Sequence, residues 1–435
     1  MSATNTISTL NGYTKQVYAQ RVLELAPKQN FLQKNIPFDE RTKIGKQYEQ
    51  PVNLALEGGF TMAASGDGAF SLNNSIAMQL QPALIDGFQI MLRSQIDYEI
   101  AAKAVSSEKA FGNATKYLIQ NMITSQSKRV EIELLYGQSG IGVIQTPTVG
   151  SPTTTGTILI TEASYADAIF SASTNHEFDV WNNANDGTST QRNTNAALVL
   201  TAFDADSRTL TISGNATDIA ALQAGDVIFF RGAKSGTSPN VVYKEMAGVN
   251  KILSTQSGNL FGISTSTYDL WKAVIQTAGS AQLTIGKVLL GTQKGVSRGL
   301  DDDTVLLVNP LTWANLASDL AALRYFDGSY KIEKGKNGVV AIEYYSQSGV
   351  IKIVSHRFVK RGEAFQFPEK YADRIGAIDM SFSLPGANGA VPDQYWFPLS
   401  GNAGYEIRLY SNQAIFFGMP ATCVKYSNIT NLQPA

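Results

Sequence analysis

The chain has 435 residues, of which 43% are hydrophobic and only 16% are charged, and its formal net charge is −1. A chain of this length is expected to form more than one domain. The balance of 35 basic and 36 acidic residues excludes a strong field that would hold nucleic acid or an anionic membrane. The share of charged residues is well below the roughly 25% of ordinary soluble domains, which indicates that much of the surface faces other subunits.

The remaining composition favours a cytosolic chain without a disulfide framework. Cys423 is the single cysteine, so intrachain disulfides are excluded and a reducing compartment is expected. The start of the sequence lacks the basic and apolar regions of a signal peptide. No stretch approaches the roughly 18 consecutive apolar residues of a membrane span, so we expect no membrane association.

The first segment, residues 1–42, is predicted to be an N-terminal arm. It begins with a Ser/Thr/Asn-rich stretch, continues with a short amphipathic helix over 12–25, and reaches Pro27, which ends that helix. An apolar patch follows on an otherwise polar background. Such an arm cannot form a core alone and must lie on another surface. The patch consists of Phe31, Leu32, Ile36 and Phe38.

The next segment, residues 43–97, is predicted to form a long extended hairpin, because apolar residues alternate along both limbs. Its tip, Glu57–Ser75, combines several glycines with apolar side chains. A loop of this kind usually docks on a partner, although folding back on its own subunit remains the alternative. The apolar residues of the tip are Phe60, Met62, Phe70 and Leu72.

Residues 98–149 are expected to hold one long helix over 113–137. Asn113 is the candidate N-cap, and Gly137 is expected to take the left-handed conformation after the last turn. A helix of this length would span on the order of 34 Å and could act as a spine along which other segments pack. An ordinary core helix is the alternative.

A Thr/Ser/Asn/Gly-rich stretch, residues 150–261, is predicted to be a β-rich insertion, because turn signals separate its short apolar runs. The expected strands are Thr157–Ile160, Ala197–Phe203, Thr209–Ser213 and Asp226–Phe230.

Residues 262–400 alternate between helical and strand patterns and predict an α/β or α+β domain. Residues 401–435 are expected to add a hairpin that turns at Ser411–Gln413, followed by a last strand over Thr422–Tyr426. The helices expected in 262–400 are Leu283–Leu300 and one capped by Asn309 that runs to Phe326; the expected strands are Thr304–Val308, Val339–Tyr345, Val350–Val354, Glu363–Phe367 and Ile378–Ser383.

The sequence contains one pattern typical of serine hydrolases. Gly295–Gly299 matches G-x-S-x-G, and Asp303 and His356 follow Ser297 in the order of that class. A nucleophile elbow requires a strand before the serine and a helix after it, whereas the pattern here predicts the reverse. We therefore expect Ser297 to end a helix, and a hydrolase remains only an alternative.

Metal and phosphate sites are not indicated. Three adjacent carboxylates at Asp301–Asp303 do not converge as a cation cage and favour a solvated turn. With two histidines, His176 and His356, and no Cys-x-x-Cys, a zinc site is not expected. A mild basic cluster could touch DNA weakly, but a solvated face is the simpler interpretation. It comprises Lys352, Arg357, Lys360 and Arg361.

The order of arm, hairpin, spine helix, β insertion and α/β domain resembles the major capsid proteins of tailed bacteriophages with the Hong Kong 97-type fold. The stretches that carry the resemblance are packing and turn signatures rather than catalytic motifs. They include AGDVIFFRGA (224–233), KEMAGVNKIL (244–253), LFGISTSTYDLWK (260–272), residues 286–327, YYSQSGVIKIV (344–354), RIGAIDMSF (374–382) and YEIRLYSNQAIFF (405–417).

This resemblance implies an α+β capsid fold and a structural role without catalytic, metal or cofactor sites. Leu283–Met380 would form the axial domain, and the spine helix with Tyr405–Tyr426 would form the peripheral domain. Lys43–Ile96 would be the extended loop that lies over a neighbouring subunit. The intersubunit contacts expected are those of Phe31, Leu32, Phe38, Phe60, Met62, Phe70 and Leu72.

The implied partners are copies of the same chain, arranged as hexamers and pentamers of an icosahedral virion shell around double-stranded DNA that is bound without sequence preference. A scaffolding protein, a portal and decoration proteins would also be partners, and assembly with procapsid maturation would take place in the host cytoplasm. An encapsulin-type bacterial nanocompartment is the alternative within the same fold, although those shells usually have shorter chains without such an insertion.

Overall fold

The structure is a computed structural model of the chain, and it describes residues 27–39, 47–99, 114–149, 154–183, 188–318, 332–334, 340–383 and 396–431. The helix expected over 12–25, the cap at Asn113 and the helix segment from 319 to 326 lie outside these residues. The chain divides into two compact units. Unit 1 comprises Met1–Ala26, Leu92–Ser125 and Phe382–Leu409, and unit 2 comprises Pro27–Met91, Gln126–Ser381 and Tyr410–Ala435.

In unit 1, a short β-sheet edge is held by aromatic and charged side chains. Strand β21 (Trp396–Pro398) runs antiparallel to the first part of β22 (Gly404–Phe417), and β3 (Phe88–Asp97) also pairs with β22. The rings of Tyr98 and Tyr405 meet edge-on at 4.7 Å between centroids. Arg93 Nε donates to Glu406 Oε2 at 2.6 Å, which ties β3 to β22 through side chains as well.

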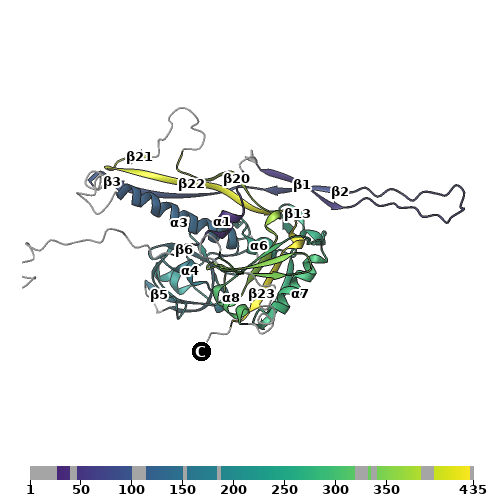
Figure 1. Ribbon diagram of the computed structural model, residues 1–435. Coiled ribbons are helices and arrows are strands. Elements are labelled where there is room, and N and C mark those ends of the chain that lie inside the picture. Colours follow the sequence, from purple (N-terminus) through teal and green to yellow (C-terminus); the bar gives the residue numbers. More distant parts are fainter. Residues whose placement is uncertain are drawn as a thin grey trace, which may run out of the picture. The chain divides into compact units, whose positions relative to one another are not determined.

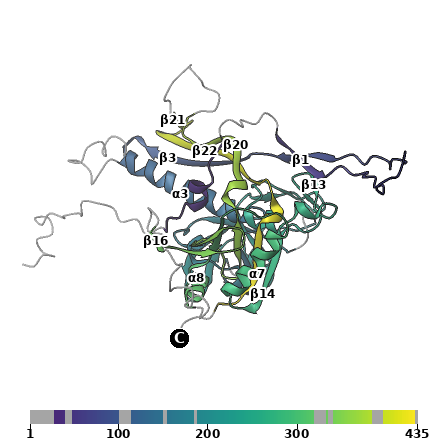
Figure 2. The same ribbon diagram turned by 45° about the vertical axis from the view of Figure 1, so that its right-hand side comes forward.

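In unit 2, an antiparallel two-stranded ribbon projects from the remainder of the unit (Figures 1 and 2). Strand β1 (Tyr48–Ala55) pairs with β2 (Gln79–Ile85), with Pro51 opposite Pro82. Prolines are tolerated because a two-stranded ribbon leaves one edge of each strand unpaired. The predicted hairpin is confirmed for these limbs, but its extension past Phe88 is wrong, since β3 pairs with β22 instead of β1.

The predicted long helix is α3 (Ala114–Tyr136), which has 23 residues. Gly137 follows it but does not take the left-handed conformation; Gln138 does, with φ of 61°. The reason for glycine at 137 is close packing, because a Cβ there would lie 2.1 Å from the carbonyl oxygen of Met246. The prediction of a left-handed Gly137 is therefore wrong.

The β-rich insertion forms a closed barrel in the order β4-β5-β8-β7-β6-β9. The four expected strands are present, and two more complete the barrel: β6, which the sequence pattern did not indicate, and β4, which precedes residue 150. Short helices α4 (Asp167–Phe170) and α5 (Ala216–Ala220) lie in the connections. The barrel strands are β4 (Gly142–Val149), β5 (Thr155–Ile160), β6 (Glu177–Trp181), β7 (Leu198–Asp204), β8 (Thr209–Ser213) and β9 (Val227–Phe230).

A seven-stranded mixed sheet, in the order β14-β23-β19-β15-β18-β17-β16, forms the second large element of unit 2. Its strand β15 (Thr304–Val308) is buried on both faces, as its unbroken apolar run predicts. Helix α7 (Ile285–Val296) packs on one face, with Thr284 as its N-cap. Helix α8 (Pro310–Ala317) follows β15, with Asn309 as the predicted cap. The other strands are β14 (Val274–Ala281), β16 (Ile332–Lys334), β17 (Val340–Tyr345), β18 (Val350–Ser355), β19 (Ala364–Phe367) and β23 (Val424–Ile429).

The hairpin expected near the C-terminus is not formed. Residues 404–417 are one strand, β22, whose second part pairs antiparallel with β20 (Ala372–Ser381). Ser411, Asn412 and Gln413 are buried within this strand. Strand β23 lies between β14 and β19 in the seven-stranded sheet.

The remaining elements are short. They are α1 (Phe31–Asn35), α6 (Val249–Ser254), the strand pairs β10 (Lys234–Ser235) with β11 (Val242–Tyr243) and β12 (Asn259–Leu260) with β13 (Ile263–Ser264), and the 3-10 turns η2 (Glu162–Ser164), η3 (Asp269–Trp271), η4 (Glu369–Tyr371) and η5 (Pro420–Thr422).

Candidate subunit-contact surfaces

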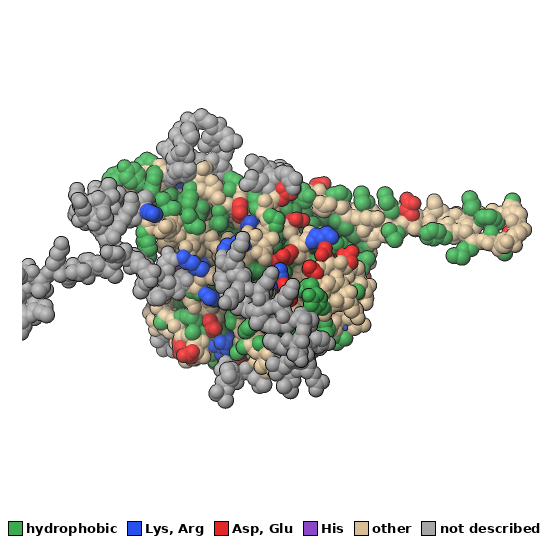
Figure 3. All heavy atoms as spheres, viewed as in Figure 1, with side chains coloured by type: hydrophobic (Ala, Val, Ile, Leu, Met, Phe, Trp, Pro, Cys, Tyr) green, Lys and Arg blue, Asp and Glu red, His purple; other side chains and the backbone are tan. Residues whose placement is uncertain are grey.

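The hairpin tip, Glu57–Ser75, presents its apolar side chains to solvent. Phe60 is 80% exposed, Met62 is 93% exposed and Leu72 is 79% exposed, and Phe70 is also exposed. Hydrophobic side chains line the projecting ribbon (Figure 3). A monomer seldom leaves so many apolar side chains in water along one element, so this arrangement is typical of a surface that a partner covers. The exposed apolar side chains beside the tip are Leu56, Ile76, Met78 and Leu80.

The backbone of the tip has a defined course. Gly58 N–H donates to the Ile76 carbonyl at 2.9 Å, and the Asn73 side chain donates to the Phe60 carbonyl at 2.8 Å. At the far end, the Asp67 carboxylate accepts from Ala64 N–H at 2.7 Å. These bonds hold the two sides of the tip together while the apolar side chains point outward.

The predicted arm residues lie in a different setting, which we call the arm anchor: α1, Glu131, His356 and Arg374. Helix α1 has no capping side chain of its own. Glu131 of α3 supplies the cap, because its carboxylate accepts from Leu32 N–H at 2.7 Å and from Gln33 N–H at 3.2 Å. A carboxylate at a helix N-terminus satisfies backbone donors that would otherwise be buried without partners.

Arg374 of β20 holds the other end of α1. Its guanidinium donates to the carbonyls of Ile36 at 2.8 Å and Gln33 at 3.1 Å, and it is itself held by Asp379 and Gln413. The next residues of the arm continue along β20, with Phe38 bridged to Arg374. Both ends of α1 are therefore fixed by side chains of the same unit.

Three predicted contact residues lie at the arm anchor. Leu32 is fully buried in its own chain, so it presents no surface to a neighbouring subunit here. Phe31 packs against the same core and against the His356 ring, with 6.5 Å between ring centroids. Phe38 lies against Arg374. Leu32 therefore has an intrachain packing role. Phe31 and Phe38 are half-buried and stay predicted intersubunit contacts, as do the tip residues.

The hydrolase triad is not assembled. His356 is fully buried, and its Nε2 lies 3.0 Å from Glu131 Oε1, while its Nδ1 accepts from Phe358 N–H at 3.3 Å. Both ring nitrogens are thus engaged without Ser297. Ser297 Oγ donates to the Gln293 carbonyl at the end of α7, and the helix precedes the strand, as the pattern predicted.

The acidic turn makes local bonds instead of a cation cage. Asp302 pairs with Lys370 at 2.9 Å, and Asp303 accepts from Val350 N–H at 2.7 Å. The bond to Lys370 is the main reason that the pKa of Asp302 is lowered. Among the described residues, no group of three His, Cys, Asp or Glu side chains could hold a metal ion.

The basic cluster is not one solvated face. Lys360 is buried, donates to the Gly140 carbonyl at 2.9 Å, and lies 4.1 Å from the centre of the Tyr136 ring. Burial lowers the pKa of Lys360 to about 8. Arg361 pairs with Asp167 at 3.3 Å. Lys352 and Arg357 are exposed, so the cluster divides into two exposed cations, one buried cation and one paired cation.

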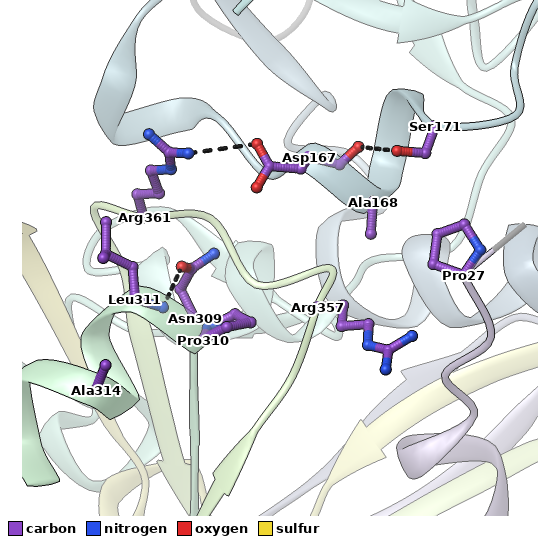
Figure 4. A pocket seen from close by; sticks show the side chains of 10 residues that line it. All are labelled: Pro27, Asp167, Ala168, Ser171, Asn309, Pro310, Leu311, Ala314, Arg357 and Arg361. Carbon is purple, nitrogen blue, oxygen red and sulfur yellow. Dashed lines mark hydrogen bonds and ion pairs between the residues drawn. The ribbon is translucent and has the colours of Figure 1, made fainter. Parts of the chain in front are cut away.

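An open pocket of about 720 Å³ lies beside α4 and α8 (Figure 4). Its walls mix apolar residues with Arg357, Arg361 and Asp167, and the Arg361–Asp167 pair closes one side. The pocket shows no converging set of polar groups typical of a cofactor site.

Within the described residues, none of the helices combines the length and the apolar character needed to cross a membrane.

No family model matches the chain, and no curated protein matches it. Several solved structures are similar to the chain. The capsid of a native GTA particle is similar over 98% of this chain and 100% of that one, with a TM-score of 0.50 and 6% identity. The capsid of cyanophage A-1(L) covers 92% of both chains, with a TM-score of 0.48 and 13% identity. The holo-SrpI encapsulin of Synechococcus elongatus PCC 7942 covers 99% of this chain and 98% of its own, with a TM-score of 0.45 and 8% identity.

The similarity extends over nearly the whole chain and concerns the fold. Together with the projecting hairpin and the long helix α3, it indicates the fold: the chain has an α+β fold of the Hong Kong 97 type, with an inserted β-barrel.

Proposed function

We propose that this chain is the major capsid protein of a tailed bacteriophage, a subunit that assembles into hexamers and pentamers of an icosahedral shell. The fold supports a shell-forming role. The proposal rests mainly on the hairpin tip. Hydrogen bonds hold its backbone, and its apolar side chains are exposed to solvent in the isolated chain. A neighbouring copy that covers the tip would remove this apolar surface from water, and many identical contacts per shell would add up.

The packaged DNA, the assembly partners and the place of assembly that we propose follow from the same capsid role. The shell encloses double-stranded DNA, and the near-zero net charge leaves that DNA loosely held. Assembly in the host cytoplasm uses a scaffolding protein and a portal, decoration proteins bind the finished head, and the procapsid matures to the virion. No catalytic step is proposed for the chain.

The test replaces apolar side chains of the tip. In F60S/M62S/L72S, assembly into large particles is expected to fall at least tenfold, measured by sedimentation and negative-stain microscopy of the purified protein. Because these side chains are exposed, the free energy of unfolding of the unassembled subunit should change by no more than about 0.5 kcal/mol per substitution.

The matched control is S65A/S71A, which alters two exposed side chains of the same tip without removing apolar surface. It should assemble like the wild type. If the triple variant assembles as efficiently as this control, the tip does not make the contact proposed. Shells that contain a co-purified cargo enzyme instead of DNA would favour an encapsulin-type compartment.

A further inference from the structure

A lysine, an asparagine and a glutamate meet where α6 packs against β23 in unit 2. Lys425 of β23 donates from Nζ to Asn250 Oδ1 at 2.5 Å, and the same Nζ lies 2.9 Å from Glu363 Oε1. Asn250 is 8% exposed and Lys425 is 9% exposed. An amine, a side-chain amide and a carboxylate are therefore in direct contact at a site from which water is largely excluded.

The lysine nitrogen is close to the amide carbon of Asn250 as well as to its oxygen. A carbonyl bond is about 1.2 Å long, so the 2.5 Å contact between Nζ and Oδ1 places Cγ within about 3.7 Å of Nζ. Reacting atoms in a near-attack arrangement are about 3–3.5 Å apart. Ser254 Oγ also donates to Asn250 Oδ1, at 3.2 Å, and would stabilise the negative charge that this oxygen gains when a nucleophile adds to Cγ.

Glu363 supplies a group that can take a proton from the lysine. Its Oε1 forms the ion pair with Lys425, while its Oε2 is buried and has no hydrogen-bond partner among the described residues. A buried acceptor without a donor is costly, and a carboxylate that gains a proton has one unpaired acceptor fewer. The carboxylate can therefore hold a proton while it stays beside the amine.

We propose that Lys425 and Asn250 join in an intrachain isopeptide bond, with Glu363 as the group that transfers protons. Glu363 takes a proton from the ammonium, and the freed amine adds to Asn250 Cγ. Glu363 then gives that proton to the amide nitrogen and takes one from the attacking nitrogen. The bond from Cγ to the amide nitrogen breaks, and ammonia leaves with the proton held by Glu363, as ammonium. One C–N bond forms and one breaks, so no oxidant or reductant is needed.

The bond ties together two segments that are 175 residues apart in the sequence. It joins α6, which follows the barrel, to the last strand of the seven-stranded sheet. A covalent link across so long a loop restricts the unfolded chain and persists in denaturant. The denatured wild type should therefore be more compact than an unlinked chain and migrate faster in denaturing gel electrophoresis.

The experiment is mass spectrometry of the purified, denatured full-length protein. The wild type should be lighter than the mass calculated from its sequence by one ammonia molecule. Trypsin should not cleave after Lys425, because its side chain is an amide, and the digest should contain a branched peptide that includes Lys425 and Asn250. Lys425→Arg removes the nucleophile and Glu363→Gln removes the proton-transfer group, so both variants should have their full calculated mass.

Lys294 is the internal control, because it donates to Gln276 Oε1 at 2.8 Å but pairs with no carboxylate among the described residues. Trypsin should cleave after it. Glu162→Gln, which alters an exposed carboxylate, should keep the branched peptide.

The proposal is overturned if the wild type has its full calculated mass and is cleaved after Lys425, or if Glu363→Gln still forms the branched peptide. Should a variant fail to fold, the mass of the wild type alone decides whether the bond forms.

Discussion

Glu131 connects three separate parts of the sequence at one carboxylate. It lies on α3, caps α1 through two backbone N–H groups, and accepts from His356 at the end of β18. All of these donors are buried or partly buried, so they depend on this acceptor rather than on water. The N-terminal end of α1 thus depends on one carboxylate, that of Glu131.

Glu131→Ala is expected to destabilise the chain by about 3 kcal/mol, because it leaves the His356 donor and two helix N-terminal N–H groups without an acceptor. Urea unfolding of the unassembled subunit measures this change. Glu162→Ala, which removes only an exposed carboxylate, should cost about 0.5 kcal/mol or less. Equal effects of the two substitutions would show that the arm anchor does not depend on Glu131.

Single-residue predictions from sequence succeeded where the local pattern decides the outcome. Asn309 caps α8 and Ser297 ends α7, because caps and helix ends depend on neighbouring residues. Leu32 illustrates the opposite case. An apolar residue on a polar arm must be covered, but the sequence does not say whether its own chain or a neighbour covers it.

At the scale of elements, β22 shows how tertiary contacts override local composition. Ser411, Asn412 and Gln413 have the composition of a turn. In the structure they are buried in a strand, where Asn412 accepts from Ala377 N–H and Gln413 accepts from Arg374. These partners on β20 satisfy the polar side chains, and no local signal in the sequence reveals them. Strand β6 was missed for a related reason, since its two neighbours in the barrel come later in the chain.

The hairpin tip is the element on which the proposed function depends, and its amides report on contacts directly. Few backbone bonds hold the tip, so its amides should exchange rapidly with deuterium in the unassembled subunit. In assembled particles, exchange over 57–76 should slow at least tenfold, because a neighbouring copy excludes water. The buried strand β15 serves as the internal control, with slow exchange in both states. Equal exchange of the tip before and after assembly would contradict a contact there.

At the scale of the whole molecule, the order of segments and the α+β class followed from sequence, and the structure supports both. The pairing of strands could not be predicted from the sequence, because the barrel and the seven-stranded sheet join segments that are distant in the chain. The low charge is consistent with a surface that other subunits cover. The sequence also predicted that the tip contacts a neighbouring subunit, and the exposure of its apolar side chains supports that proposal.

The most direct test of the shell-forming role is electron cryomicroscopy of the purified full-length protein, with and without a co-expressed scaffolding protein. We expect closed icosahedral shells of hexamers and pentamers in which residues 57–75 of each copy lie on a neighbouring subunit. Stable monomers under both conditions, or particles in which the tip contacts only its own chain, would contradict it.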